Sequence, residues 1–327
     1  MATTVEMEQP EKVWGGGNKP FAVSYGKIMM WFFIISDALS FSGFLTAYGF
    51  MRYANVLSWP VAEDVFTHFP FLTGDHPLLY VALMTFILIM SSVTMVLAVH
   101  HGHNNEKGKV ILWMALTVVG GLIFLGSQAW EWSHFISGDK GAVEINKPGW
   151  VSARATDGKM QDIRLGKNVI MHVVTSDGEK LSLSQVVDGK EHGHESNHGL
   201  EFSSEQVISA FKNNADLELV MPGKEKLVVP HAAAVNLLDE NALSVQGANM
   251  VRNEYGKKQF ANFFFFITGF HGFHVFSGVV LNFIVFYNVF LGTYKKRGHY
   301  EMVEKVGLYW HFVDLVWVFV FTFFYLV

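Results

Sequence analysis

The stretch PLLYVALMTFILIMSSVTMVLAV, residues 77–99, contains no Asp, Glu, Lys or Arg. A helix needs about 20 apolar residues to cross the hydrocarbon core of a bilayer, which is roughly 30 Å thick. Lipid offers no partners for open backbone N–H and C=O groups, so a spanning stretch of this kind should be a helix. This segment therefore predicts a membrane protein.

Four other segments are long and apolar enough to span. Half of the 327 residues are hydrophobic, and 30 of them are Phe. Asp37 is the only charge in the first segment and Asp314 the only charge in the last, while the third is uncharged up to Glu131. The sequence predicts an all-α bundle of five transmembrane helices at residues 28–50, 77–99, 110–136, 260–291 and 306–327.

Lys and Arg in the short connections predict the orientation, because they favour the cytoplasmic side. The segment 1–27 carries Lys12, Lys19 and Lys27, whereas residues 53–76 contain no Lys or Arg. Basic residues return after the second span and between the last two, at Lys107, Lys109, Lys295, Lys296, Arg297 and Lys305. We expect a cytoplasmic N-terminal tail at 1–27, and an outward-facing C-terminus and segment 137–259.

Residues 137–259 are polar and predict an inserted small, mostly β extramembrane domain. Asp157-Gly158, Asp177-Gly178 and Pro222-Gly223 separate alternating runs and predict hairpins. Ser203 and Gln206 predict a capping box at the start of a short helix. The domains expected are thus 1–27, spans one to three at 28–136, the insertion at 137–259, and spans four and five at 260–327.

Composition excludes several kinds of chemistry. The chain has no Cys, which excludes disulfides, thiolate metal sites and thiol nucleophiles. The formal net charge is -5, and no basic excess suggests nucleic acid. The N-terminal residues lack the apolar core of a cleaved signal peptide.

Polar side chains within the spans are the candidate functional residues, because they are costly in lipid and usually face protein or water. One interpretation is a redox or proton-transfer site, since His binds haem iron or copper and carboxylates relay protons. The other is interhelical hydrogen bonding between closely packed helices. The candidates are Asp37, Gln128, Glu131, His271, His274, His311 and Asp314.

Metal-binding alternatives are few. A bis-His haem would require facing His residues on two helices, and only His100 or His101 with His311 could supply them. The tract EHGHESNH, residues 191–198, could bind Zn²⁺ or Cu²⁺, although such a tract is more often a flexible loop. Asp37 is equally compatible with a structural and a proton-related role.

The membrane portion resembles subunit III of the haem-copper oxidases. Four motifs carry the resemblance, in the family's order together with IISDALSFSGF near the start: SSVTMVLAVHHG from Ser91, GGLIFLGSQAWEW at 120–132, FITGFHGFHVFSG at 266–278 and LYWHFVDLVWVFVF at 308–321. It is similar to the five-helix bacterial form, which lacks two helices of the mitochondrial form. Two departures are Asp37, where the family usually has Glu, and the long insertion at 137–259.

The resemblance implies an accessory subunit of the bacterial inner membrane, without a redox centre or metal of its own. Haem and copper would reside in oxidase subunits I and II, and a phospholipid-filled cleft would support proton uptake by subunit I. Asp37, Glu131, His271 and Asp314 match the family's intramembrane polar positions. The resemblance also implies packing or lipid-cleft roles for Trp130, Trp132, Trp310, His100 and His101.

Two other hypotheses stay open. The chain could be a b-type cytochrome membrane anchor that carries haem between its helices. Separately, the insertion could dock another respiratory complex or the electron donor, because it is large and expected to face outward.

Overall fold

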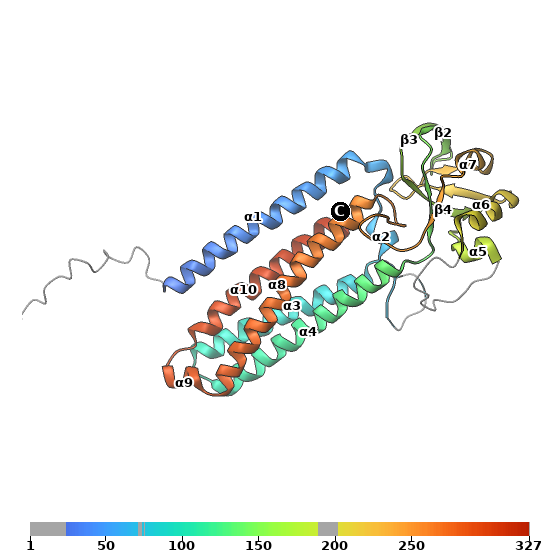
Figure 1. The fold of residues 1–327 in the computed structure, drawn as a ribbon. Helices are drawn as coiled ribbons and strands as arrows, with labels where there is room; N and C mark the ends of the chain where they lie inside the picture. Colours follow the sequence, from blue (N-terminus) through green and yellow to red (C-terminus); the bar gives the residue numbers. More distant parts are fainter. Residues whose placement is uncertain (1–23, 71–73, 75, 189–201, 327) are drawn as a thin grey trace, which may run out of the picture.

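The computed structural model describes residues 24–70, 74, 76–188 and 202–326, and five long helices dominate it (Figure 1). All five are long and apolar enough to cross a membrane, which confirms the predicted all-α bundle. Each begins or ends beyond the apolar run read from the sequence, because polar residues such as Lys107 continue the helix. The five are α1 (Tyr25–Ala54), α3 (Leu79–His103), α4 (Lys107–Ser137), α8 (Lys258–Phe290) and α10 (Glu301–Val320), which η2 (Phe321–Leu326) extends as a π-helix.

Four of these helices, α3, α4, α8 and α10, form the packed bundle, and α1 lies along its side (Figure 1). Only Ile34, Phe41 and Tyr48 of α1 are buried. Their spacing of seven residues places them on one narrow stripe of the helix. Most of the other apolar side chains of α1 are exposed, as in a helix in contact with lipid.

Stacked and edge-on aromatic rings fill the bundle near the end that carries the insertion, which we call the insertion end. The Phe135 ring lies 4.5 Å from that of Phe264 and 5.0 Å from that of Tyr255, centre to centre. Phe324 in turn contacts Phe260 at 5.0 Å. These are favourable separations for aromatic pairs, so α4, α8 and η2 are held together here by rings.

The insertion folds around one antiparallel seven-stranded sheet with the order β3-β2-β6-β5-β4-β1-β7. Its apolar core includes Val173, Phe211 and Leu219. In the part of the insertion that the structure describes, three short helices accompany the sheet. The elements are β1 (Ala142–Ile145), β2 (Gly149–Arg154), β3 (Met160–Leu165), β4 (Val169–Thr175), α5 (Leu183–Asp188), α6 (Ser204–Asn213), β5 (Leu217–Val220), β6 (Val228–Val229), α7 (His231–Leu237) and β7 (Leu243–Val245).

Two of the three predicted hairpins are confirmed, as is the capping box of α6. Asp157-Gly158 joins the paired strands β2 and β3, and Pro222-Gly223 joins β5 and β6. The third hairpin prediction is wrong in its second arm. After Asp177-Gly178 the chain pairs back only briefly: Lys180 bridges to Val174 and the Leu181 N–H donates to the Val173 carbonyl, and the chain then forms α5. Ser182 explains the change, since its hydroxyl accepts the backbone N–H of Gln185 and starts a helical turn.

The inserted domain sits directly on the insertion end of the bundle. The turn at Gly223 packs against η1 (Val56–Ser58), which follows α1 and precedes the short helix α2 (Ala62–Val65). Lys226 Nζ lies 3.2 Å from a carboxylate oxygen of Asp64. The backbone N–H of Ala248 donates to the carbonyl of Phe135 in the last turn of α4, at 3.1 Å. At the opposite end, α9 (Thr293–Arg297) lies in the connection between α8 and α10.

A first prediction concerns Gly223, whose φ of +148° suits only glycine. A Cβ there would lie 2.5 Å from the carbonyl oxygen of Leu57. We expect Gly223→Ala to destabilise the docked domain by about 1–3 kcal/mol, through backbone strain and this clash. The measurement is the thermal unfolding midpoint of the purified chain in detergent.

The matched control is Gly166→Ala, because a Cβ at Gly166 meets no atom within 4 Å and its φ is not in the left-handed region. Equal unfolding midpoints for the two variants would contradict the docking described here.

Candidate functional site

His271 and His274 both face the interior of the bundle from α8, but they have different surroundings. His271 is completely buried, and neither ring nitrogen has a hydrogen-bond partner among the described residues. Its ring instead packs against Trp317, at 5.1 Å between centres, and against the edge of Phe124 at 5.9 Å. His271 is therefore a packing residue of the aromatic core.

His274 joins α8 to α1 through Asp37. Its Nε2 lies 2.9 Å from Oδ2 of Asp37, and both side chains are nearly buried. Its Nδ1 lies 2.8 Å from the carbonyl oxygen of Phe270. A carbonyl only accepts, so Nδ1 carries a hydrogen. The contact therefore joins α1 to α8 through two titratable side chains near the middle of α1.

Glu131 is the centre of a hydrogen-bonded group at the insertion end. Gln128 Nε2 donates to its Oε2 at 2.7 Å, which confirms that the two share a helix face. The Tyr325 hydroxyl approaches both carboxylate oxygens, at 3.1 and 3.2 Å. Beside them is a cavity of about 20 Å³, lined also by His68 and His134. That volume is enough for one water molecule.

His311 and Asp314 share a face of α10, as their spacing predicts, but they do not act as a pair. Ser92 on α3 lies 2.6 Å from His311 Nδ1. Asp314 is buried, and neither of its carboxylate oxygens has a hydrogen-bond partner among the described residues. The adjacent Trp310 donates its indole N–H to Ser91 at 3.1 Å. Polar contacts of two adjacent residues, Trp310 and His311, thus connect α10 to α3.

The remaining predicted packing residues also have protein partners. Trp132 donates its indole N–H to the Thr268 hydroxyl at 3.0 Å and so joins α4 to α8. Trp130 is half-buried, its ring 3.9 Å from that of His134 and 4.5 Å from that of Tyr80. At the end of α3, His101 contacts Glu106 at 2.6 Å, and His100 lies 3.4 Å from the Asn104 amide.

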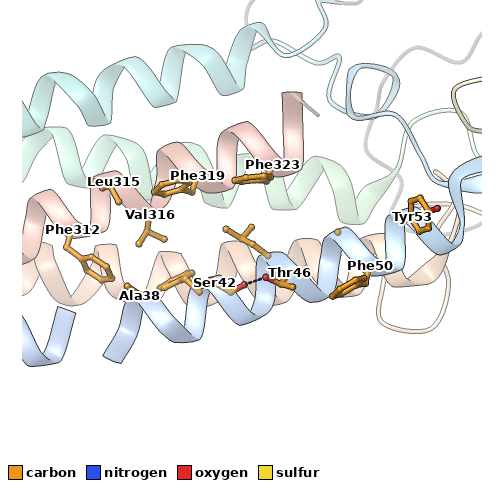
Figure 2. Close-up of a pocket in the computed structure, with 13 residues that line it drawn as sticks. Ala38, Ser42, Thr46, Phe50, Tyr53, Phe312, Leu315, Val316, Phe319 and Phe323 are labelled. Atoms are coloured by element: carbon orange, nitrogen blue, oxygen red, sulfur yellow. Dashed lines mark hydrogen bonds between the residues drawn. The ribbon is translucent and has the colours of Figure 1, made fainter. Parts of the chain in front are cut away.

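An apolar groove of about 640 Å³ runs between α1 and α10. Figure 2 shows its two walls, with Ser42 and Thr46 on α1 facing Val316, Phe319 and Phe323 on the other side. The Thr46 hydroxyl donates to the backbone carbonyl of Ser42, so it adds no free polar group to the wall. A groove of this size and character suits an apolar ligand.

A second polar cluster lies outside the spans, where the insertion meets the bundle. Glu254 is fully buried, and its carboxylate accepts backbone N–H groups of Asp139 and Gly247. Burial raises the pKa of Glu254 to about 7, against the opposing effect of these two donors. Burial likewise lowers the pKa of His172, to about 3, and also lowers that of Lys180. Of these groups, Glu254 links the end of α4 to the segment before α8 through its two backbone contacts.

Metal ligands do not gather in the part of the chain that the structure describes. No three His, Asp or Glu side chains there are placed to hold an ion. The tract 191–198 lies outside the described residues. The residues of the proposed haem pair, His100 or His101 with His311, each have a polar side chain beside one ring nitrogen.

Several site residues were missed by sequence reasoning. Tyr325 and Ser92 have common residue types in apolar runs, so nothing in the sequence distinguishes them. Glu254 is one of many acidic residues in the insertion. The partnership of Asp37 with His274 crosses more than two hundred residues, and only the fold reveals it. The groove beside α1 likewise depends on how two helices diverge.

Comparison with known proteins supports the resemblance predicted from the motifs. Residues 242–327 match the family model described as cytochrome c oxidase subunit III. A wheat (Triticum aestivum) protein named cytochrome c oxidase subunit 3 is 34% identical over 105 residues, which cover 32% of this chain and 39% of that protein. The protein of the same name from Thermostichus vulcanus is 40% identical over 72 residues. These residues cover 20% of this chain and 33% of that protein.

A third relative, from Rickettsia conorii, is named probable cytochrome c oxidase subunit 3 and is 40% identical over 68 residues. That match covers 20% of this chain and 24% of the relative. The chain therefore matches about two fifths or less of the length of these curated relatives. The match to the family model begins at residue 242, just before β7, and thus includes the last two spans with His271, His274, His311 and Asp314.

A second prediction tests the Asp37–His274 contact. Removing one partner of a buried ion pair leaves the other charge buried without a partner, which typically lowers the stability of the fold by about 3–5 kcal/mol. We expect Asp37→Leu and His274→Leu each to lower the unfolding midpoint strongly. The double variant should lose less stability than the two single variants lose together. The measurement is a double-mutant cycle by thermal unfolding in detergent.

Ser40→Leu is the control, since Ser40 is exposed on α1 and its hydroxyl bonds only to its own helix. Strict additivity of the two single losses would show that Asp37 and His274 do not interact.

Proposed function

We propose that this chain, a member of the cytochrome c oxidase subunit III family, is an accessory subunit of a proton-pumping haem-copper terminal oxidase that reduces O₂ to water. The observation that carries the proposal is the family match over α8 and α10, on a chain with five helices able to span a membrane. Subunits I and II would be its partners and would hold haem and copper. This chain would contribute assembly and stability.

The bonding of the polar residues supports a role without a redox centre. Helix-to-helix contacts engage His274, His311 and Glu131, and His271 is enclosed by rings. These arrangements favour the accessory subunit over the b-type cytochrome anchor. For the membrane placement, we propose the bacterial inner membrane, with a cytoplasmic N-terminus and with the insertion and C-terminus on the periplasmic side.

Support for proton uptake by subunit I would come from the nearly buried contact between Asp37 and His274, which places two titratable side chains between α8 and the most exposed of the five spans. Docking of another respiratory complex through the insertion is a further proposal. Its support is that the domain is fixed to the bundle at several points, so that it can present a constant surface.

A third prediction tests the accessory role. We expect the tagged chain, purified in mild detergent, to bring down haem-containing oxidase subunits, and to be colourless and metal-free when separated from them. The measurements are visible spectra and metal analysis of both preparations. His311→Leu should leave the haem spectrum of the co-purified complex unchanged.

A Soret band that stays with the separated chain and disappears in His311→Leu or His100→Leu would overturn the accessory role in favour of the haem anchor.

We also propose that the groove between α1 and α10 holds phospholipid acyl chains, because its walls are apolar along most of α1. A fourth prediction follows. Gly49 lines the groove, and a Cβ there would meet no atom within 4 Å. Gly49→Trp should therefore occupy the groove and reduce the phospholipid retained per chain, as quantified by mass spectrometry after delipidating washes.

Gly126→Trp on α4 is the matched control, since Gly126 is also exposed with open space around it. Equal lipid retention in the two variants would exclude the groove as the lipid site.

A further inference from the structure

A short turn in the insertion, residues 249–252, displays two apolar side chains that its own domain does not cover. Met250 is 64% exposed and Val251 is 72% exposed. Isolated exposed apolar residues are common and carry no meaning by themselves. This turn differs from such isolated residues in two respects: hydrogen bonds fix its conformation, and it lies at the ends of two membrane spans.

Hydrogen bonds make the turn rigid. The Asn249 side-chain oxygen accepts the backbone N–H groups of Val251 and Arg252, each at 2.8 Å. The Asn249 N–H donates to the carbonyl of Arg252, also at 2.8 Å, and Ala248 bridges to Asn253. Asn side chains commonly close turns in this way. The two apolar residues are thus held outward in a fixed geometry.

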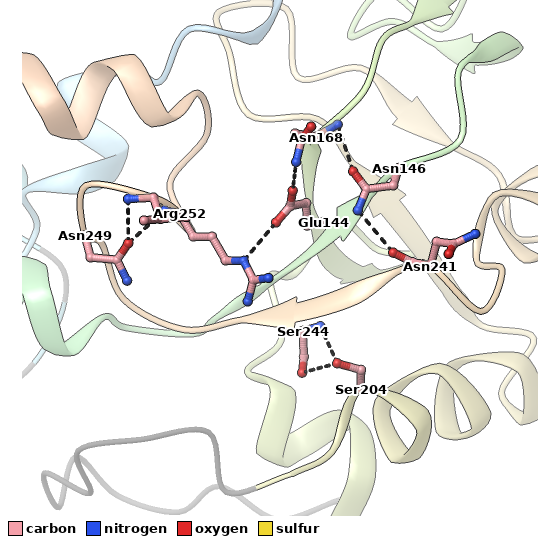
Figure 3. Close-up of polar contacts among 9 residues, drawn as sticks. Glu144, Asn146, Asn168, Ser204, Asn241, Ser244, Asn249 and Arg252 are labelled. Carbon is pink, nitrogen blue, oxygen red and sulfur yellow. Dashed lines mark hydrogen bonds and ion pairs between the residues drawn. The ribbon is translucent and has the colours of Figure 1, made fainter.

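A partly buried ion pair fastens the turn to the sheet (Figure 3). Arg252 Nε lies 3.5 Å from Oε2 of Glu144, which is buried on β1. The other carboxylate oxygen of Glu144 accepts the side-chain amide of Asn168. The turn is therefore anchored at its base and cannot fold its apolar tip back into the domain.

The turn lies where two membrane spans end. Ala248 bonds to the carbonyl of Phe135, in the last turn of α4, and Lys258 begins α8. Ile136, beside Phe135, is 51% exposed and belongs to the lipid-facing surface of the bundle. The turn is thus joined to the ends of both helices, and the ends of spanning helices meet the headgroup region of a bilayer.

Positive charge accompanies the apolar tip. Arg252 and Lys258 are exposed, and Lys257 is half-buried. Lys and Arg at the ends of spans favour the phosphate groups of lipids, while neighbouring apolar side chains enter the boundary with the acyl chains. Exposed apolar side chains beside basic residues are more stable at a lipid surface than in water.

We propose that residues 249–252 form an interfacial membrane anchor, which inserts Met250 and Val251 into the bilayer interface at the insertion end and places Lys258 near lipid phosphates. The rigid turn lowers the entropy that insertion would otherwise cost, because its conformation is already fixed. The anchor would orient the inserted domain on the membrane. It depends on the membrane spans, and not on the oxidase role proposed above.

The chain has no Cys, so a single labelled Cys can report on this position. The experiment attaches an environment-sensitive fluorophore to Met250→Cys in the full-length chain, with its co-purified subunits, in vesicles of phosphatidylcholine and phosphatidylglycerol. Lys212→Cys is the matched control, since it is exposed on α6 at the far side of the insertion (Figure 1). Val251→Cys serves as a second probe if Met250→Cys does not fold.

We expect the label at Met250 to emit at shorter wavelength than the label at Lys212, and to be quenched by a nitroxide on the lipid headgroup but not by aqueous iodide. Emission and iodide quenching equal to those at Lys212 would place the tip in water and overturn the proposal. Shielding from both quenchers would also overturn it, because the tip would then be covered by a neighbouring protein.

Discussion

The lack of hydrogen-bonding partners in the bilayer is the constraint on which this structure depends. The backbone N–H and C=O groups find partners within helices, and the polar side chains find partners on neighbouring helices. Three Trp indoles show the pattern. Trp317 donates to Thr85, Trp310 to Ser91 and Trp132 to Thr268, so each N–H finds a small hydroxyl on a neighbouring helix. Large apolar rings and short polar groups together fix which helices are neighbours.

The same constraint explains why α1 differs from the other spans. It contributes few buried side chains, so specific contacts have to hold it. Lys27 pairs with Glu304 near one end, at 2.6 Å, and Asp37 pairs with His274 near the middle. At the other end the Gly223 turn packs on Leu57. Between these contacts the helix stands off α10, and the groove is the result. The insertion is therefore part of what positions α1.

The sequence predicted the elements that local chemistry decides. Uncharged apolar runs predicted the five spans, Asp157-Gly158 predicted a hairpin, and Ser203 with Gln206 predicted a helix start; the structure contains all of these. Periodicity placed Gln128 and Glu131 on one face, and they are hydrogen-bonded. It could not reveal Tyr325 as their third member, because that contact joins residues 194 positions apart. The strand expected after Asp177-Gly178 failed for a related reason: the alternation in KLSLSQVV is also compatible with the short amphipathic helix that Ser182 begins.

Spacing along one helix proved a poor guide to function for the histidines. His271 and His274 look like a pair of ligands in sequence, since both face inward three residues apart. Their environments separate them: aromatic rings surround one, and the other holds a carboxylate of α1. A ligand pair would need both ring nitrogens to converge on one point, and the rings instead meet different helices. The carboxylate that His274 reaches is an Asp, whose shorter side chain requires α1 to approach α8 closely at that level. The contact therefore ties α1 to α8 near the middle of α1, and the groove lies between that level and the insertion end, where residues from Ala38 to Tyr53 line it.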